Sequence, residues 1–198
     1  MSQLVSTSKS YLAIAQAREA LQDADPRDFK QEWVKGKEEF HLRTKGHTEY
    51  VIARHVATKA DSMYSIRVKS FNREEPLSIR FGDPLHNQVR QSFNDISALR
   101  VAQREFVRDS VEGGALLHHV RERDFYSVGS SLKGTLFTSE LLDTGSGLVL
   151  VRGDLSTDLS HPGNRLILEV TWRSSIGTGG PLAFVVDRRY AALLEPSR

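Results

Sequence analysis

The sequence predicts a mainly β protein, an antiparallel β-sandwich or jelly roll with an N-terminal helix and one helical insertion. Three observations predict this class. Apolar and polar residues alternate in several short segments, glycine, proline, serine and asparagine separate those segments, and two longer stretches have helical spacing instead. Alternating strands argue against a parallel βαβ sheet, whose strands are apolar along their whole length.

The N-terminal segment has apolar residues at helical spacing, which predicts a helix near residues 10–23, capped by Ser8 or Ser10. Asp25-Pro26 ends the helix, because proline disfavours the helical conformation in the residue before it. We therefore expect an N-terminal helical segment over residues 1–28. The helix packs on its own domain or reaches across to a partner subunit.

The rest of the chain, residues 29–198, is expected to form a single β-rich domain, because 198 residues more often make one domain than two. Its clearest early strand places Arg67, Lys69 and Phe71 on one face. Residues 72–76 are predicted to form a turn, and Leu77, Ile79 and Phe81 to lie in the next strand of the hairpin.

The helical insertion is predicted around residues 85–112, and Gly113-Gly114 would end it. Arg100, Arg104 and Arg108 lie four residues apart and would form one row beside its apolar stripe. This row has two interpretations. It contacts an anionic partner, or it is a solvated helix face whose arginines pair with neighbouring carboxylates.

The last third of the chain returns to strand patterns. Alternation within one of these segments gives it an inward face, made of Leu166, Leu168, Val170 and Trp172. The glycine-rich stretch 177–180 lacks the lysine and hydroxyl residue of a phosphate-binding loop, and we expect a hairpin loop there.

Composition excludes several classes of protein. The chain contains no cysteine, so disulfides and thiolate metal sites are absent. Its 27 basic and 25 acidic side chains give a net charge of +2, which permits nucleic-acid contact without the dense basic footprint of a duplex-coating protein. We find neither a signal peptide nor a transmembrane segment in the sequence, and expect a soluble protein.

A search for catalytic or metal-binding motifs yields little. His118 and His119 are adjacent and would point to opposite faces of a strand. His41, His47 and His55 lie on successive β segments without a carboxylate at a diagnostic spacing. No glycine-flanked nucleophilic serine is present either. We therefore expect no enzymatic activity, no metal and no cofactor.

The order of the β segments resembles that of a known group of proteins. The segments are SMYSIRVKSFNREEPLSIRFGDPL, LKGTLFTSELL, LVLVRGDLSTDL and NRLILEVTWRSSI. They resemble the β-cores of small RNA-virus single jelly-roll coat proteins and of the related plant-virus movement-protein superfamily. Lys69-Ser70 and Asp154 stand where the movement proteins carry a Lys-Ser strand end and an aspartate element. The resemblance implies a jelly-roll fold, self-assembly and RNA contact.

The leading functional hypothesis is a non-enzymatic, self-assembling structural protein, a viral coat protein located in the virion or the host cytoplasm. Its partners would be further copies of itself and RNA. One alternative is an RNA-binding movement or accessory protein, and another is a small hydrolase whose histidine and carboxylates meet only in the fold. The predicted nucleic-acid contacts are Arg67, Lys69, Arg80, Arg100, Arg104 and Arg108.

Overall fold

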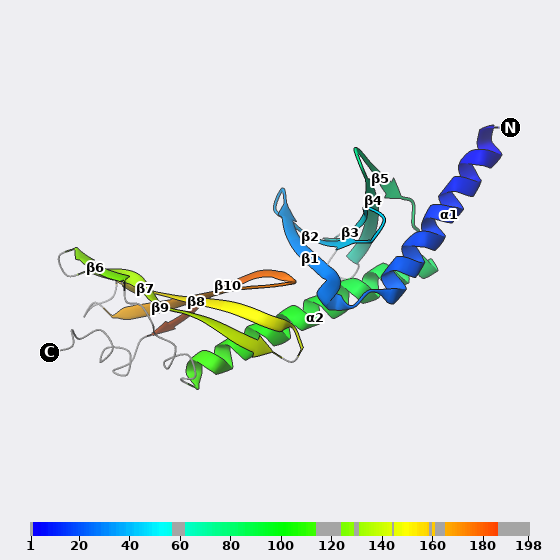
Figure 1. Cartoon of the computed structure of the whole chain (residues 1–198). Coiled ribbons are helices and arrows are strands. Elements are labelled where there is room, and N and C mark those ends of the chain that lie inside the picture. The colour runs from blue at the N-terminus through cyan, green and yellow to red at the C-terminus, as the bar shows by residue number, and fades with distance from the viewer. Residues whose placement is uncertain are drawn as a thin grey trace. The chain divides into compact units, whose positions relative to one another are not determined.

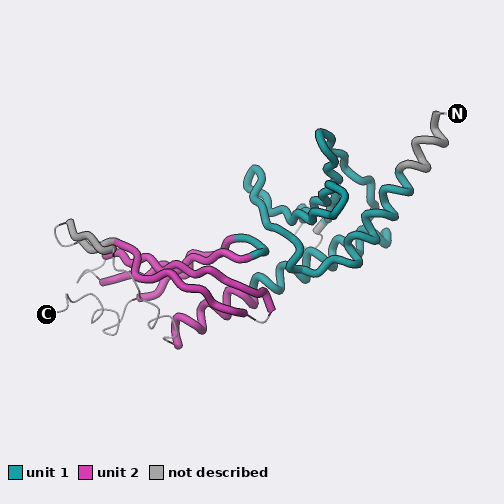
Figure 2. Tube along the Cα trace, viewed as in Figure 1, with its two compact units in different colours: residues 1–101, 175–177 teal, residues 102–174, 178–198 magenta. Residues whose placement is uncertain are grey.

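The structure is a computed structural model of the chain and describes residues 2–56, 62–113, 124–128, 131–143, 145–158, 160 and 165–185. The predicted fold class is confirmed, because the chain is mainly antiparallel β with an N-terminal helix and one helical insertion (Figure 1). The elements divide between two compact units, coloured separately in Figure 2. The sequence pattern, in contrast, predicts a single β-rich domain over residues 29–198.

Unit 1 comprises residues 1–101 and 175–177. It begins with helix α1, which starts earlier than the sequence predicts. Its five strands form a sheet in the order β1-β2-β3-β4-β5, an antiparallel meander. The elements are α1 (Ser2–Asp23), the short 3-10 helix η1 (Pro26–Asp28), β1 (Phe29–Val34), β2 (Lys37–Arg43), β3 (Thr48–Val56), β4 (Ser62–Ser70) and β5 (Arg73–Leu77).

Unit 2 comprises residues 102–174 and 178–198. Its sheet has the order β10-β9-β8-β7-β6, which is again chain order. Helix α2 (Pro84–Glu112) contributes residues to both units, and the helical insertion predicted around residues 85–112 is thereby confirmed. The strands are β6 (Asp124–Val128), β7 (Ser131–Asp143), β8 (Gly147–Thr157), β9 (Leu166–Ser174) and β10 (Gly177–Val185).

Each unit has its own hydrophobic core, and α2 supplies side chains to both. Phe93 and Ile96 of α2 pack in the core of unit 1, whereas Val107 and Val111 pack in the core of unit 2. The apolar stripe of α2 is interrupted near Arg100, which is only partly buried and charged. That interruption coincides with the boundary between the units at residues 101 and 102.

The β4–β5 hairpin differs from the sequence prediction. Ser70 pairs with Arg73, so the turn has only two residues, Phe71 and Asn72, and residues 73–77 form β5 instead of a turn. Lys69 pairs directly with Glu74 across the hairpin, so the charged residues that suggested a loop find opposite charges on the neighbouring strand. Pro76 is tolerated because β5 lies at the edge of the sheet.

The glycine stretch 177–180 also differs from its prediction, because it begins β10 rather than forming a loop. A Cβ atom at Gly179 would lie 2.2 Å from Cε2 of Trp172. The glycine therefore allows the backbone of β10 to lie against the tryptophan ring on β9. The predicted inward face of β9 is confirmed, since Leu168, Val170 and Trp172 are buried and Leu166 packs beside them.

Candidate functional site

Arg67 and Lys69, two of the predicted RNA contacts, point to the outer face of the unit 1 sheet, opposite the core. Arg67 Nη2 donates to Glu39 Oε2 at 2.7 Å, and its Nε lies 2.6 Å from Glu74 Oε1 without the alignment of a hydrogen bond. Lys69 Nζ lies 3.8 Å from Glu49 Oε2 and 4.0 Å from Glu74 Oε2. Their charges are therefore compensated within the sheet.

The three arginines of the predicted row on α2 differ in their partners. Arg100 pairs with Glu38 of β2, and its burial lowers the pKa of its guanidinium although Glu38 opposes this. Arg108 pairs with Glu105 on the same helix at 2.6 Å. Arg104 is exposed on α2, and Arg80 is exposed in the loop before it. Within the described ranges, no carboxylate lies within 4.0 Å of the guanidinium group of either residue.

A buried histidine, His41, lies on the outer face of the unit 1 sheet. His41 is 3% exposed, and its ring nitrogens lie 3.5–3.7 Å from carboxylate oxygens of Glu32, Glu39 and Glu49. These distances are too long for good hydrogen bonds. Figure 1 shows the β1–β2 and β4–β5 hairpins bending away from α2, which makes this face concave.

The histidine arrangement gives little support for catalysis. His47 lies in the β2–β3 turn with its ring 6.3 Å from that of Phe71, and His55 Nε2 is 2.8 Å from Ser65 Oγ. These two residues do not join His41. His118 and His119 lie outside the described residues. Within the part of the chain that the structure describes, no group of three histidine, aspartate or glutamate side chains is arranged to hold a metal ion.

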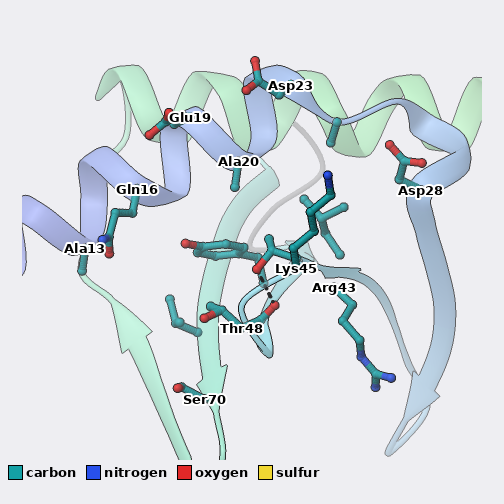
Figure 3. Close-up of a pocket in the computed structure, with 15 residues that line it drawn as sticks. Ala13, Gln16, Glu19, Ala20, Asp23, Asp28, Arg43, Lys45, Thr48 and Ser70 are labelled. Atoms are coloured by element: carbon teal, nitrogen blue, oxygen red, sulfur yellow. Dashed lines mark hydrogen bonds between the residues drawn. The ribbon is translucent and has the colours of Figure 1, made fainter.

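The first large hollow lies in unit 1 between α1 and the β2–β3 hairpin (Figure 3) and has a volume of about 990 Å³. Glu19 and Asp23 line it from α1, and Arg43 and Lys45 from the hairpin. Burial raises the pKa of the Tyr50 hydroxyl on its floor, and Glu19 raises it further. Because both acidic and basic side chains line this hollow, its charge does not favour an anionic ligand over a cationic one.

The second large hollow lies on the outer face of the unit 2 sheet and has a volume of about 940 Å³. Three of its lining residues form a row across neighbouring strands. Glu140 of β7 pairs with Leu150 of β8, and Leu150 pairs with Arg173 of β9. Leu142 and Leu148 form the next pair along the same face. The three leucines are 77%, 51% and 44% exposed at positions 142, 148 and 150.

The apolar run in β8 is a sequence signal for this second surface. In β8, Val149 and Val151 alternate with Leu148 and Leu150, so one set must face away from the core. Both valines are buried, and the leucines face outward. A strand that is apolar on both faces indicates either a second layer or a contact with another molecule.

Comparison with known proteins identifies no relative. No protein-family model, no curated protein and no solved structure matches this chain. Neither described helix contains an apolar stretch sufficient to cross a bilayer. What the chain does must therefore be inferred from its own residues.

Proposed function

We propose that this chain is a non-enzymatic, self-associating protein whose outer unit 2 sheet face contacts a second copy of itself. One observation carries the proposal: an open sheet face bears three exposed leucines and a row in which opposite charges flank one of them. Exposed apolar surface of this kind is typical of protein interfaces.

The row Glu140–Leu150–Arg173 is complementary to itself. Consider two copies that meet face to face, related by a two-fold axis running along β8 above Leu150. The axis brings the two Leu150 side chains together and exchanges the two sides of the row. Glu140 of one copy then faces Arg173 of the other, and the same ion pair forms a second time. Neither residue forms an ion pair with any other described residue.

The ion pair next to Leu150 on β8 does not oppose the arrangement. Arg152 Nε lies 2.9 Å from Asp154 Oδ2, and its Nη2 donates to Thr135 Oγ1 at 2.8 Å. Thr135 donates in turn to Asp154 Oδ1 at 2.8 Å. The positive charge of Arg152 is therefore compensated by its own chain, and two copies can approach without repulsion between these arginines.

An isologous contact of this kind closes after two copies, so it makes a dimer and not a shell. A coat protein would need a second, different contact to join dimers into a particle. The viral coat role and the alternative movement-protein role stay proposals, and the dimer would be one building block of a coat.

Size-exclusion chromatography with light scattering, run over a concentration series, tests the contact. We expect a concentration-dependent dimer for the unchanged chain. Glu140→Arg and Arg173→Glu should each shift it towards monomer, because each places like charges opposite one another. The double variant should restore the dimer, because the exchanged charges again face their opposites.

Two further variants separate this face from general surface effects. Leu148→Ser should weaken association, whereas Phe81→Ser, at a 69% exposed residue of unit 1, should leave it unchanged. A chain that stays monomeric at all concentrations would refute the proposal. So would single and double charge variants with equal association.

A further inference from the structure

We infer that a third hollow, at the β1–β2 hairpin of unit 1, binds single-stranded nucleic acid through base stacking on Trp33 and phosphate contacts to surrounding cations. The hollow has a volume of about 410 Å³. This inference is independent of self-association, because every residue in it belongs to unit 1. The lining residues are Trp33, Gly36, Lys37, Glu38, Arg54, His55 and Phe93.

Trp33 is held in an exposed position by the geometry of the hairpin. It lies near the end of the edge strand β1, opposite Glu38, and the two-residue turn Lys35-Gly36 follows it with positive φ angles of 51° and 74°. Trp33 is 65% exposed. Trp172, in contrast, is 5% exposed, and its Nε1 donates to Gln103 Oε1 at 2.9 Å. An exposed indole beside a hollow offers a face on which a base can stack.

The charges around the hollow favour an anion. Lys35, Lys37 and Arg54 are exposed, and none has a carboxylate partner within 4.0 Å among the residues that the structure describes. Among the described residues of the lining, Glu38 is the only carboxylate. It is engaged by Arg100 and by Gln31, whose Nε2 donates to Glu38 Oε1 at 2.6 Å. Lys37 and Arg54 therefore line the hollow with Trp33, and Lys35 lies in the adjoining turn, without a carboxylate partner among the described residues.

Arg54 is fixed beside the hollow by the core. Its guanidinium carbon lies 5.3 Å from the ring centre of Phe93, which is buried on α2. A guanidinium over an aromatic ring is held in place by the cation–π interaction while its N–H groups stay available to phosphate oxygens. A single strand fits better than a duplex, because only an unpaired base can leave its neighbours and stack on the indole.

A second exposed aromatic residue near basic side chains provides a contrast. Phe71, at the β4–β5 turn, is 88% exposed, but the charges of Arg67 and Lys69 beside it are compensated by Glu39, Glu49 and Glu74. Arg73, across this turn, has no carboxylate within 4.0 Å among the described residues, so one such cation lies beside Phe71. Three such cations, Lys35, Lys37 and Arg54, lie at or next to the hollow that Trp33 lines.

Binding is tested with a fluorescently labelled single-stranded RNA oligonucleotide, followed by anisotropy, together with the intrinsic tryptophan fluorescence of the protein. We expect the oligonucleotide to quench Trp33. Trp33→Ala should reduce affinity roughly 5- to 150-fold with little change in salt dependence. Lys37→Ala and Arg54→Ala should each lower the log–log salt slope by about 0.7. Trp33→Phe should retain binding within a few-fold while the quenching disappears.

Phe71→Ala is the matched control, because it removes an equally exposed ring at another hairpin turn, and its affinity should equal that of the unchanged chain. Duplex RNA of the same sequence should bind more weakly. Equal losses in Trp33→Ala and Phe71→Ala would overturn the inference, as would absence of binding at low salt. Vesicles of anionic lipid that quench Trp33 while RNA does not would assign the hairpin to a membrane surface and also overturn it.

Discussion

The two units share one plan and differ on their outer faces. Each consists of a helix followed in the chain by a five-stranded antiparallel meander, and in each the helical side of the sheet is apolar. The outer face of unit 1 is concave and filled by its own charged residues around His41. The outer face of unit 2 carries exposed leucines instead.

The two units differ in how the apolar residues on their outer sheet faces are covered. In unit 1, Glu39 is 4% exposed, and Val51, which pairs with both His41 and Arg67, is 1% exposed. Long charged side chains cover apolar neighbours with their methylene groups while their charges pair with one another. In unit 2, Leu142, Leu148 and Leu150 on the outer face stay exposed. We therefore place the association surface on unit 2 and regard the network of unit 1 as internal to its sheet.

The largest expected effect tests whether the two units unfold separately. Ile96→Ala in the unit 1 core and Val107→Ala in the unit 2 core should each cost about 2–4 kcal/mol, because both side chains are fully buried. Hydrogen exchange should accelerate in β2–β4 for the first variant and in β7–β9 for the second. Arg104→Ala, on the same helix but exposed, is the control. Equal acceleration in both sheets would show one cooperative unit, as the sequence predicts.

The next largest effect compares an outer-face arginine from each unit. Arg67→Ala should cost about 3 kcal/mol, because it leaves the buried carboxylate of Glu39 without its cation. Arg152→Ala should cost less than about 1 kcal/mol, because its ion pair with Asp154 is largely exposed to solvent. Denaturant unfolding measures both. A small loss for Arg67→Ala would mean that the unit 1 network contributes little and that this arginine is available to a ligand.

The smallest effect concerns the junction between α1 and the unit 1 sheet. Hydrogen bonds from the Arg27 side chain and backbone lower the pKa of Asp25 to about 2, and Asp25 caps η1. A lowered pKa stabilises the fold above the ordinary value of 3.8, and this contribution is lost as the pH falls towards 2.

Because Asp25 is exposed, Asp25→Ala should cost about 0.5 kcal/mol near neutral pH and almost nothing near pH 2. Asp28→Ala, which removes the second carboxylate of the same capping box, serves as the comparison for loss of the cap hydrogen bonds. Unfolding curves at the two pH values measure both variants. An equal loss at both pH values would show that ionisation of Asp25 does not stabilise this junction.

Several features of the fold could be predicted from the sequence because they depend on local spacing. The helical period over residues 85–112 predicts α2, and alternation predicts the buried face of β9. The proline after Asp25 predicts the end of α1, which lies at Asp23. The predicted start of α1 was wrong. Residues 2–9 carry no helical apolar period, yet the helix begins at Ser2.

The candidate sites could be predicted from the sequence only in small part. The six basic residues predicted to contact RNA differ in their partners. Among the described residues, Arg67, Lys69, Arg100 and Arg108 lie beside carboxylates, whereas Arg80 and Arg104 have none within 4.0 Å. Whether any of the six contacts RNA stays a prediction. The exposure of Trp33 was not predicted, because a tryptophan in a strand is usually largely buried and the neighbouring residues do not indicate otherwise.

Periods of 3.6 and 2 along the chain were enough to predict α2 and to predict which residues of β9 share a face, because both features depend only on neighbouring residues. Only the tertiary structure decided which charges meet. Arg67 reaches Glu39 across three neighbouring strands, 28 residues earlier in the chain, and this pairing depends on the register of each strand with the next. The exposure of Leu150 and Trp33 also depends on the tertiary structure. It depends on what packs against each face of the sheet, and the local sequence pattern does not specify which face is covered.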